Sequence, residues 1–519
     1  MKFSEVTQNP VSLNQAIMRW TVLAVCLMGA MLVAYWIGTE NTTMLVLCVA
    51  LTVLAFVVGV VQDRAWVLIP VGWALAGTSS FLPGNFSIHD VCILLAFASF
   101  VGYWILTKRD MRQGWHTLDV ILAINLLWLA FTFIRNPVGF RVTGSETIGG
   151  RPYLMTFMAC LAYWVMTRLP RSPKTISWIP YMIVTGFAIG AIVNLVIYLA
   201  PSLTPYVYFL YTDVDVGSYY RYAGLEQNIV RWGQLGLFGM PLMFVLCAKY
   251  PPRTLFNPLR GRFYLFALAL VAILASGFRS FVLWAFIAVF LGSWFHRGWR
   301  EAVLAVVAAS LLIGTLIVGQ GRVYQLPLTA QRALSWLPGD WSPIAIEAGK
   351  ESSEGRFEWW RDIVKNDVIK NWWLGDGFGV SAHELSLMGA FHADFFTSTT
   401  LTGGFHNGPL TSIRYAGVVG MVLFYLYMIA AAVYSVKCVR LCRGTPLQTL
   451  AIFVAIQLVW EPFHYTLVFG GYDSQVAETV FQVSLLMLAM RTVIKWKEQR
   501  TVSPPRLPEP RVAATAAGA

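Results

Sequence analysis

Apolar residues in this chain form long uninterrupted runs, and polar residues gather in the segments between them. A helix needs roughly 17–25 apolar residues to cross the hydrocarbon core of a membrane. The chain is also 57% hydrophobic and only 12% charged, which is more apolar than a typical soluble domain. We therefore predict an all-α polytopic membrane protein with about 14 transmembrane helices. The predicted spans are residues 17–38, 43–61, 65–82, 88–106, 118–134, 152–167, 177–200, 229–248, 263–276, 281–295, 302–319, 410–436, 447–470 and 476–493.

The basic residues indicate which way the chain crosses the membrane. They cluster in five links and near the end of the last span, and with these spans all six segments fall on the side of the N-terminus. Basic loops face the cytoplasm, so both termini are predicted to be cytoplasmic. These loops also account for the net charge of +12, and we predict no nucleic-acid partner. The basic segments are 108–112, 168–174, 249–262, 297–300, 437–443 and 495–500.

One loop is much longer than the others. Residues 320–409 lie on the outer side, and about ninety residues are too many for a simple connector. We therefore divide the chain into helices 1–11 (1–319), a large, partly helical periplasmic loop (320–409) and helices 12–14 (410–500). The Pro- and Ala-rich tail, 501–519, is predicted to be disordered in the cytoplasm.

The first candidate residue in the long loop is Arg356. Ser352-Ser353-Glu354 is typical of a helix start, and apolar residues recur at helical spacing afterwards, which predicts a helix over about 354–370. Arg356 would then lie in the first turn, where both its charge and the helix end favour an anion such as phosphate. The alternative is a solvated arginine paired with Glu354 or Glu358.

The second candidate is His406, directly before the twelfth span. Pro409 suits the first helical position and Asn407 or Gly408 suits the cap. The positive end of a helix disfavours imidazolium, so we expect a neutral imidazole, the form that a general base needs. A plain surface histidine is the alternative, and His383 and His392 are weaker candidates.

Two more arginines are predicted on the outer face. Arg279 lies at the turn between two short spans, and Arg221 precedes the eighth span, beside Glu226 and Arg231. With Arg356 they would form a cationic cluster suited to a diphosphate. Contact of each side chain with lipid headgroups is the alternative.

Further polar residues have several interpretations. Glu461 and His464 lie within the thirteenth span beside a proline, where they would be a proton relay, a substrate contact or a structural hydrogen bond. Asp213 and Asp215 have the spacing of a metal–nucleotide-sugar motif, but nucleotide sugars are absent outside the cell. We predict no metal and no cofactor, because we find no His, Cys and carboxylate cluster typical of a catalytic metal site.

Several of these motifs, in this order, resemble the O-antigen ligase and polymerase family. The resemblance covers about residues 220–430, and the first six spans share only their hydrophobicity. Phe278 between the glycine and the arginine, about two extra helices and the Pro-rich tail depart from the family pattern. The motifs are Ser276-Gly277-Phe278-Arg279-Ser280, Gly355-Arg356 with Trp360, Gly375-x-Gly377-x-Gly379 and His406-Asn407.

The resemblance implies a GT-C-like, metal-independent glycosyltransferase at the periplasmic face of the bacterial inner membrane. The donor would be a polyprenyl-diphosphate-linked glycan, and the acceptor a glycan or lipid A core; membrane lipids and polysaccharide-export proteins are the other candidate partners. By carry-over, Arg279 and Arg356, with Arg221 as a weaker match, would bind the diphosphate and His406 would activate the acceptor hydroxyl. Asn407, Trp360, Glu461 and His464 are candidate supporting residues.

Three functions share these motifs. We favour a polymerase of a surface polysaccharide or exopolysaccharide. A ligase to lipid A core and a protein O-oligosaccharyltransferase are the alternatives within the same class. A flippase or transporter of lipid-linked glycans is the alternative from another class, and it should show charged residues along a central path and often internal repeats.

Overall fold

The computed structural model describes residues 62–75, 77, 86–107, 114–139, 147–168, 172–210, 229, 231–381, 386, 399–400 and 402–502. Spans predicted at 17–38 and 43–61 lie outside these residues, as do Asp213, Asp215, Arg221, Glu226, His383 and His392. Contacts divide the chain into two units. One comprises Met1–Ala65 and Leu95–Arg109, and the other holds the rest of the chain. Every site discussed below belongs to the second unit.

The described chain is almost entirely helical. Eight of its helices are long and apolar enough to cross a membrane, so this is an all-α polytopic membrane protein. These are α4 (Ile88–Thr107), α5 (Thr117–Arg135), α7 with α8 (Pro173–Ile176 and Ile179–Leu199), α13 (Arg279–Arg297), α14 (Trp299–Gly319), α19 (Gly408–Cys442), α20 (Gln448–Leu467) and α21 (Tyr472–Val502). The other elements are η2 (Gln62–Val67), α3 (Leu68–Ala74), β1 (Thr147–Ile148), α6 (Arg151–Arg168), η5 (Pro201–Leu203), α9 (Thr204–Leu210), α11 (Gly233–Lys249), η6 (Pro252–Thr254), α12 (Gly261–Ala275), α15 (Leu328–Leu334), α16 (Pro343–Lys365) and β2 (Val380–Ser381).

Most of the predicted spans correspond to helices in the structure. A helix occupies each predicted span from residue 88 onward, although α11 and α12 are shorter than a full crossing. The span predicted at 65–82 contains the short helices η2 and α3 in its described part. Large apolar side chains such as Leu127, Ile134 and Leu304 are exposed along the long helices, as expected where lipid replaces water.

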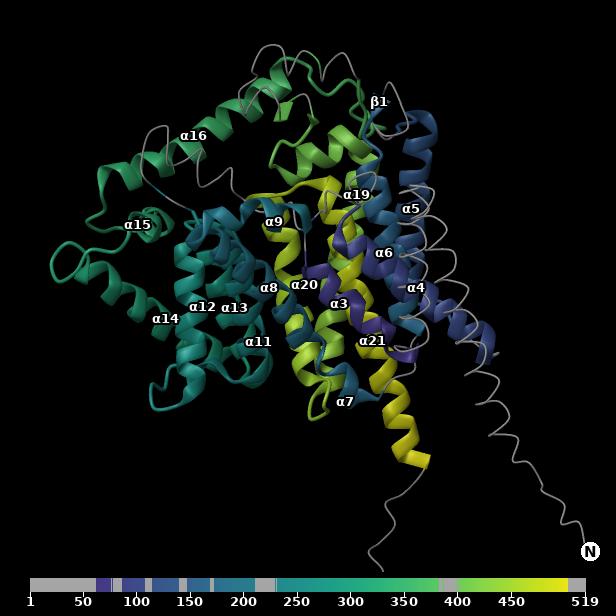
Figure 1. Ribbon diagram of the computed structural model, residues 1–519, viewed down its shortest axis with the longest axis horizontal. Helices are drawn as coiled ribbons and strands as arrows, with labels where there is room; N and C mark the ends of the chain where they lie inside the picture. The colour runs from purple at the N-terminus through teal and green to yellow at the C-terminus, as the bar shows by residue number, and fades with distance from the viewer. Residues whose placement is uncertain are drawn as a thin grey trace, which may run out of the picture. The chain divides into compact units, whose positions relative to one another are not determined.

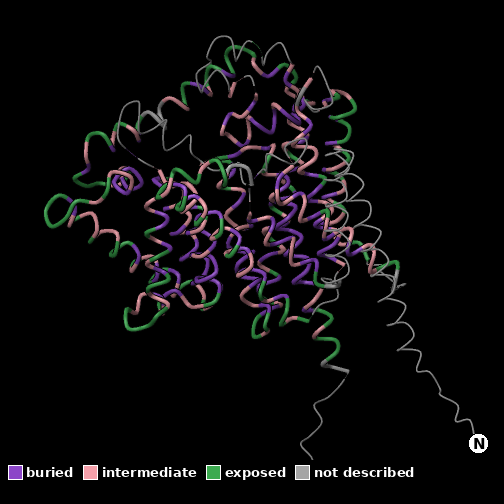
Figure 2. The backbone as a smooth tube through the Cα atoms, viewed as in Figure 1, coloured by how far each residue is buried: buried purple, intermediate pink, exposed green. Residues whose placement is uncertain are grey.

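The helices of the second unit pack in two neighbouring groups. Helices α5, α6, α19, α20 and α21 contact one another, and α8, α11, α12, α13 and α14 form the other group. Helix α20 joins them through α8, α11 and α13. Buried residues lie along the helices where they meet one another, and many of the links are exposed (Figure 2).

Successive long helices run in opposite directions, so the links that join them lie alternately at one end of the bundle and at the other. The basic links 249–261, 297–299 and 442–448 lie at one end, and α15 and α16 lie at the other (Figure 1). We call the second of these ends the α16 end. The side of the membrane that each end faces stays a prediction from the basic residues.

The large loop is folded where the structure describes it. Helix α15 contacts α12, α13 and α16, while β2 pairs antiparallel with β1, with Thr147 opposite Ser381 and Ile148 opposite Val380. The predicted start of the loop helix at residue 354 is wrong, because α16 begins at Pro343 after Ser342. Proline suits a first helical turn, and the Ser352-Ser353 pair that we interpreted as a cap lies in the helix interior.

Candidate functional site

The turn between α12 and α13 presents Arg279. Within this turn the buried Ser276 hydroxyl donates to the Ile273 carbonyl (2.6 Å) and accepts from the Phe278 amide (3.3 Å). The Gly277 carbonyl accepts a hydrogen bond of 2.9 Å from the buried guanidinium of Arg332 on α15. Arg279, the first residue of α13, therefore directly follows a turn that is held by hydrogen bonds within the turn and by one from α15.

The Arg279 side chain lies directly against α16. A Cβ atom added to Gly349 would overlap Nη2 of Arg279 and would lie 2.8 Å from its Cζ. Only glycine has no Cβ, so this residue lets the guanidinium approach the helix backbone. No local pattern in the sequence marks Gly349 for this role.

Arg356 lies on the same helix, two turns beyond Gly349. Seven residues advance a helix by roughly 10 Å and return to the same face. Burial lowers the pKa of Arg356, and the positive charge of Arg279 lowers it further, so the two cations act on each other. Neither Arg279 nor Arg356 forms an ion pair with a carboxylate among the described residues.

This placement corrects the argument that we made for Arg356. The residue lies in the interior of α16 and not in its first turn, so the helix N-terminus adds no positive potential at this point. The positive charge that acts on it is that of Arg279. Arg332 and Arg231 add two more guanidinium groups at the turn before Arg279, where Arg332 donates to Gly277 and the Arg231 guanidinium lies 5.8 Å from the Phe278 ring. Tertiary packing, and not the helix dipole, makes this region cationic.

His406 directly precedes α19. Asn407 is the N-cap and its side chain accepts from the Leu410 amide (3.0 Å), which confirms the predicted cap, although Pro409 is the second helical residue and not the first. His406 itself has a φ of +51°, a conformation that costs free energy in a non-glycine residue. Its ring packs on that of Phe469, with centroids 4.7 Å apart.

The imidazole of His406 is electrostatically linked to Arg356. Burial lowers the pKa of His406 to about 4, and the charge of Arg356 contributes to the decrease. The neutral imidazole that we predicted is therefore what the structure indicates at pH 7, but burial and a neighbouring cation are its causes. Its basicity will increase when an anion offsets the charge of Arg356.

Two tryptophans attach α16 to the segment that carries His406. The Trp360 indole donates to the carbonyl of Phe405 (2.8 Å), and the Trp359 indole donates to the Thr400 hydroxyl (2.6 Å). Phe405 is fully buried against Trp359. Because Trp360 follows Arg356 by one helical turn and Phe405 directly precedes His406, these contacts fix the position of Arg356 relative to His406.

The glycine-rich segment 375–379 follows a turn at 372–374 and packs on α19. The amides of Asp376 and Gly377 donate to the carbonyls of Arg414 and Tyr415 (2.7 and 3.0 Å). Helix α19 is kinked at Gly417, and a Cβ on Gly375 would lie 2.6 Å from the backbone of Tyr415. The segment therefore fastens the loop to α19, and the amides of Asp376 and Gly377 are already used in hydrogen bonds and cannot bind a phosphate.

Glu461 and His464 belong to a separate cavity inside the bundle. Both line a cavity of about 260 Å³ between α3, α8, α11, α13, α20 and α21. Within the described residues, neither Oε1 of Glu461 nor Nδ1 of His464 has a hydrogen-bond partner. The structural hydrogen bond that we considered for them is therefore not seen.

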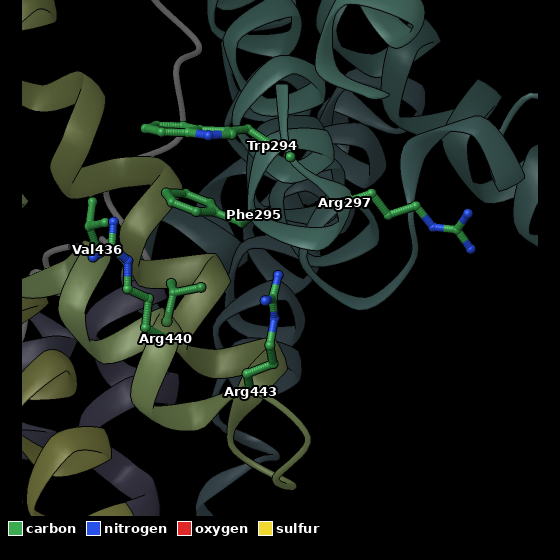
Figure 3. A pocket seen from close by; sticks show the side chains of 8 residues that line it. Trp294, Phe295, Arg297, Val436, Arg440 and Arg443 are labelled. Atoms are coloured by element: carbon green, nitrogen blue, oxygen red, sulfur yellow. The ribbon is translucent and has the colours of Figure 1, made fainter. Parts of the chain in front are cut away.

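A second group of arginines lines a cavity at the opposite end of the bundle. This cavity, of about 320 Å³, is lined by Arg297, Arg440 and Arg443 together with Trp294 and Phe295. Figure 3 shows Arg297 extending away from the other two arginines. Arg279 and Arg297 are the first and last residues of α13, so roughly 27 Å of helix separates this cavity from Arg279.

The structure therefore brings together three of the predicted residues, Arg279, Arg356 and His406. Sequence reasoning missed Arg332, Gly349 and Phe469, which gain their importance only from contacts between distant segments. In the part of the chain described, no group of three or more His, Cys, Asp or Glu side chains is arranged to hold a metal ion. No protein-family model matches this chain, and no curated protein matches it.

Proposed function

We propose that this protein is an inner-membrane glycosyltransferase that moves a glycan from a polyprenyl diphosphate to an acceptor hydroxyl at the periplasmic face. The observation that carries the proposal is the pairwise link from Arg279 to Arg356 and from Arg356 to His406. Two cations without a carboxylate partner in the described chain, next to a neutral base, suit a reaction that expels a diphosphate and deprotonates an alcohol.

The reaction is written as a displacement at the anomeric carbon. The imidazole of His406 takes the proton of the acceptor hydroxyl, and the acceptor oxygen forms a bond to the anomeric carbon. The bond from that carbon to the diphosphate oxygen breaks, and the leaving diphosphate keeps the electron pair. Arg279 and Arg356 stabilise its negative charge by hydrogen bonds and by Coulomb attraction.

Before the donor binds, His406 would be a weak base. Arg356 lowers the pKa of His406, and a bound diphosphate would offset that charge. The imidazole would then become a stronger base only when the donor is in place. This coupling would limit proton abstraction by His406 before the donor has bound.

A polymerase of surface polysaccharide or exopolysaccharide is the reaction that we favour, with ligation to lipid A core or to a protein as the alternative. The test incubates purified protein with a polyprenyl-diphosphate oligosaccharide. We expect wild type to lengthen the lipid-linked glycan and His406→Ala to abolish the product. Arg356→Gln should impair it strongly, whereas Arg361→Gln, an exposed arginine of the same helix, should not.

Other results separate the alternatives. Product that forms only when lipid A core or an acceptor protein is added would identify a ligase, with the same roles for these residues. A donor that crosses the membrane but is never consumed would contradict the transferase and support a flippase. The observation that favours this second class is the pair of carboxyl side chains, Glu461 and Glu478, inside the bundle.

A further inference from the structure

The cavity around Glu461 has mostly apolar walls but contains several polar groups within a membrane-spanning part of the protein. Its carboxyl, amide and imidazole groups come from α20 and α21. Apolar side chains of α3, α8, α11 and α13 form most of the remaining wall, together with the indole N–H groups of Trp73 and Trp284. Glu461 lies six residues before the end of α20, and Glu478 lies six residues after the start of α21. Both carboxyl groups are therefore roughly 9 Å along their helices from the α16 end.

The two carboxyl groups have different surroundings. Both oxygens of Glu478 accept hydrogen bonds, Oε2 from the Trp73 indole (2.7 Å) and Oε1 from the Gln482 amide (2.9 Å). Glu461 is 2% exposed, and within the described residues its Oε1 has no donor. Both carboxyl oxygens of Glu478 therefore have a hydrogen-bond donor, whereas Oε1 of Glu461 has none among the described residues.

Other atoms in the cavity also lack partners in the described part of the chain. Gln482 is 4% exposed and its Oε1 accepts no hydrogen bond, although its amide nitrogen donates to Glu478. Nδ1 of His464 has no partner, and its ring lies 4.8 Å from that of Trp284. Among the described residues of this cavity, the two oxygens and the His464 nitrogen therefore lack a donor or a positive charge, and the indole N–H of Trp284 is a donor that lacks an acceptor.

The charged groups around Glu461 do not neutralise it. Helix α20 contributes His464, α21 contributes Glu478, and none of the residues lining the cavity is a lysine or an arginine. Behind Trp73, His89 of α4 lies edge-on to the indole and is paired with Asp90 (3.1 Å). A buried carboxylate without a counterion is costly, so this cavity requires a positive charge that its lining residues do not supply.

We propose that the cavity binds one small cation, a proton or an alkali metal ion, at Glu461 with Oε1 of Gln482. Carboxylate and amide oxygens bind both species, and His464 lies beside them to share a proton. The cation would enter from the α16 end, because that end is closer to both carboxyl groups. The proposal does not depend on glycan transfer, and a cation site inside a bundle suits a transferase or a transporter.

The test uses a carbodiimide, which modifies carboxyl groups that carry a proton. The full-length protein is kept in a buffer with N-methylglucamine as the only bulk cation, treated with dicyclohexylcarbodiimide between pH 5 and pH 9, and digested for mass spectrometry. We expect modification of Glu461 that decreases by about tenfold for each unit of pH once the group loses its proton. Glu461→Gln should remove the modified peptide.

Sodium or potassium chloride, at constant ionic strength, distinguishes the two cations. If either salt slows the modification of Glu461 at fixed pH, the cavity binds that metal ion; if only pH matters, it binds a proton. Glu301, which is paired with Arg253 (3.2 Å), is the internal control for the salts, and its modification at fixed pH should not differ between sodium, potassium and N-methylglucamine. A Glu461 that is never modified, or is modified at a rate independent of pH and of both salts, overturns the proposal. Because the label is located in the wild-type protein, the outcome does not depend on whether a variant folds.

Discussion

Replacing Gly349 by alanine tests how Arg279 is positioned without altering any charge. The added Cβ would lie 2.8 Å from Cζ of Arg279 and would overlap Nη2. Ordinary contacts of a Cβ begin near 3.4 Å, so Cζ must retreat by about 0.6 Å and Nη2 by more. A shift of this size will break at least one charge-assisted hydrogen bond to a phosphate, worth about 1.5–3 kcal/mol.

This change should weaken binding and leave stability nearly unchanged. A loss of about 1.5–3 kcal/mol corresponds to binding of polyprenyl diphosphate that is roughly 10- to 100-fold weaker. Alanine also favours a helix by about 1 kcal/mol over glycine, which offsets part of the cost of crowding. We therefore expect weaker binding with a melting temperature close to that of wild type.

The assay measures binding of polyprenyl diphosphate to purified protein by calorimetry, with thermal unfolding in parallel. Gly314→Ala in α14 is the matched control, because no atom lies within 4 Å of the Cβ that it adds. That variant should keep wild-type binding. If Gly349→Ala binds as tightly as wild type, the reasoning that Arg279 must occupy its present position is refuted.

Three further predictions concern the surroundings of this site. Trp360→Phe leaves the carbonyl of Phe405 without its donor, so we expect about 1–3 kcal/mol less stability, and an unchanged unfolding midpoint would contradict this. Arg356→Gln removes a charge that lowers the pKa of His406. The pKa of His406 should therefore rise above about 4, but it should stay below 6.5 because the side chain is still buried. The pKa is measured by ¹⁵N NMR of labelled histidine, and an unchanged value would contradict the link between the two residues. Gly417→Ala places a side chain at a φ of +71° and against a backbone carbonyl. We therefore expect a free energy of unfolding that is lower by about 1–2 kcal/mol. A melting temperature equal to that of wild type would show that the kink tolerates alanine.

The sequence alone was sufficient to predict the membrane class and the positions of most helices. Apolar runs extend over consecutive residues, and the cost of placing an unpaired backbone in lipid makes each run a helix regardless of its neighbours. The cap at Asn407 was also predictable from the sequence, because its side chain accepts a hydrogen bond from an amide only three residues away.

Local reasoning failed where the signal was ambiguous within the loop. Ser352-Ser353-Glu354 has the composition of a helix start, but the helix begins earlier, at Pro343. Serine competes only weakly with an established helix, so the pair is accommodated in the interior. The argument that tied Arg356 to a helix end was consequently wrong, although the residue does lie beside other cations.

Only the tertiary structure decided which polar residues act on one another. Arg279, Arg356 and His406 are separated by 77 and 50 positions in the chain, and no periodic pattern relates them. Their proximity depends on the missing Cβ of Gly349, on the hydrogen bond from Trp360 to Phe405 and on the ring of Phe469. The sequence determines each helix through contacts between near neighbours, whereas a site made from three helices depends on how those helices pack.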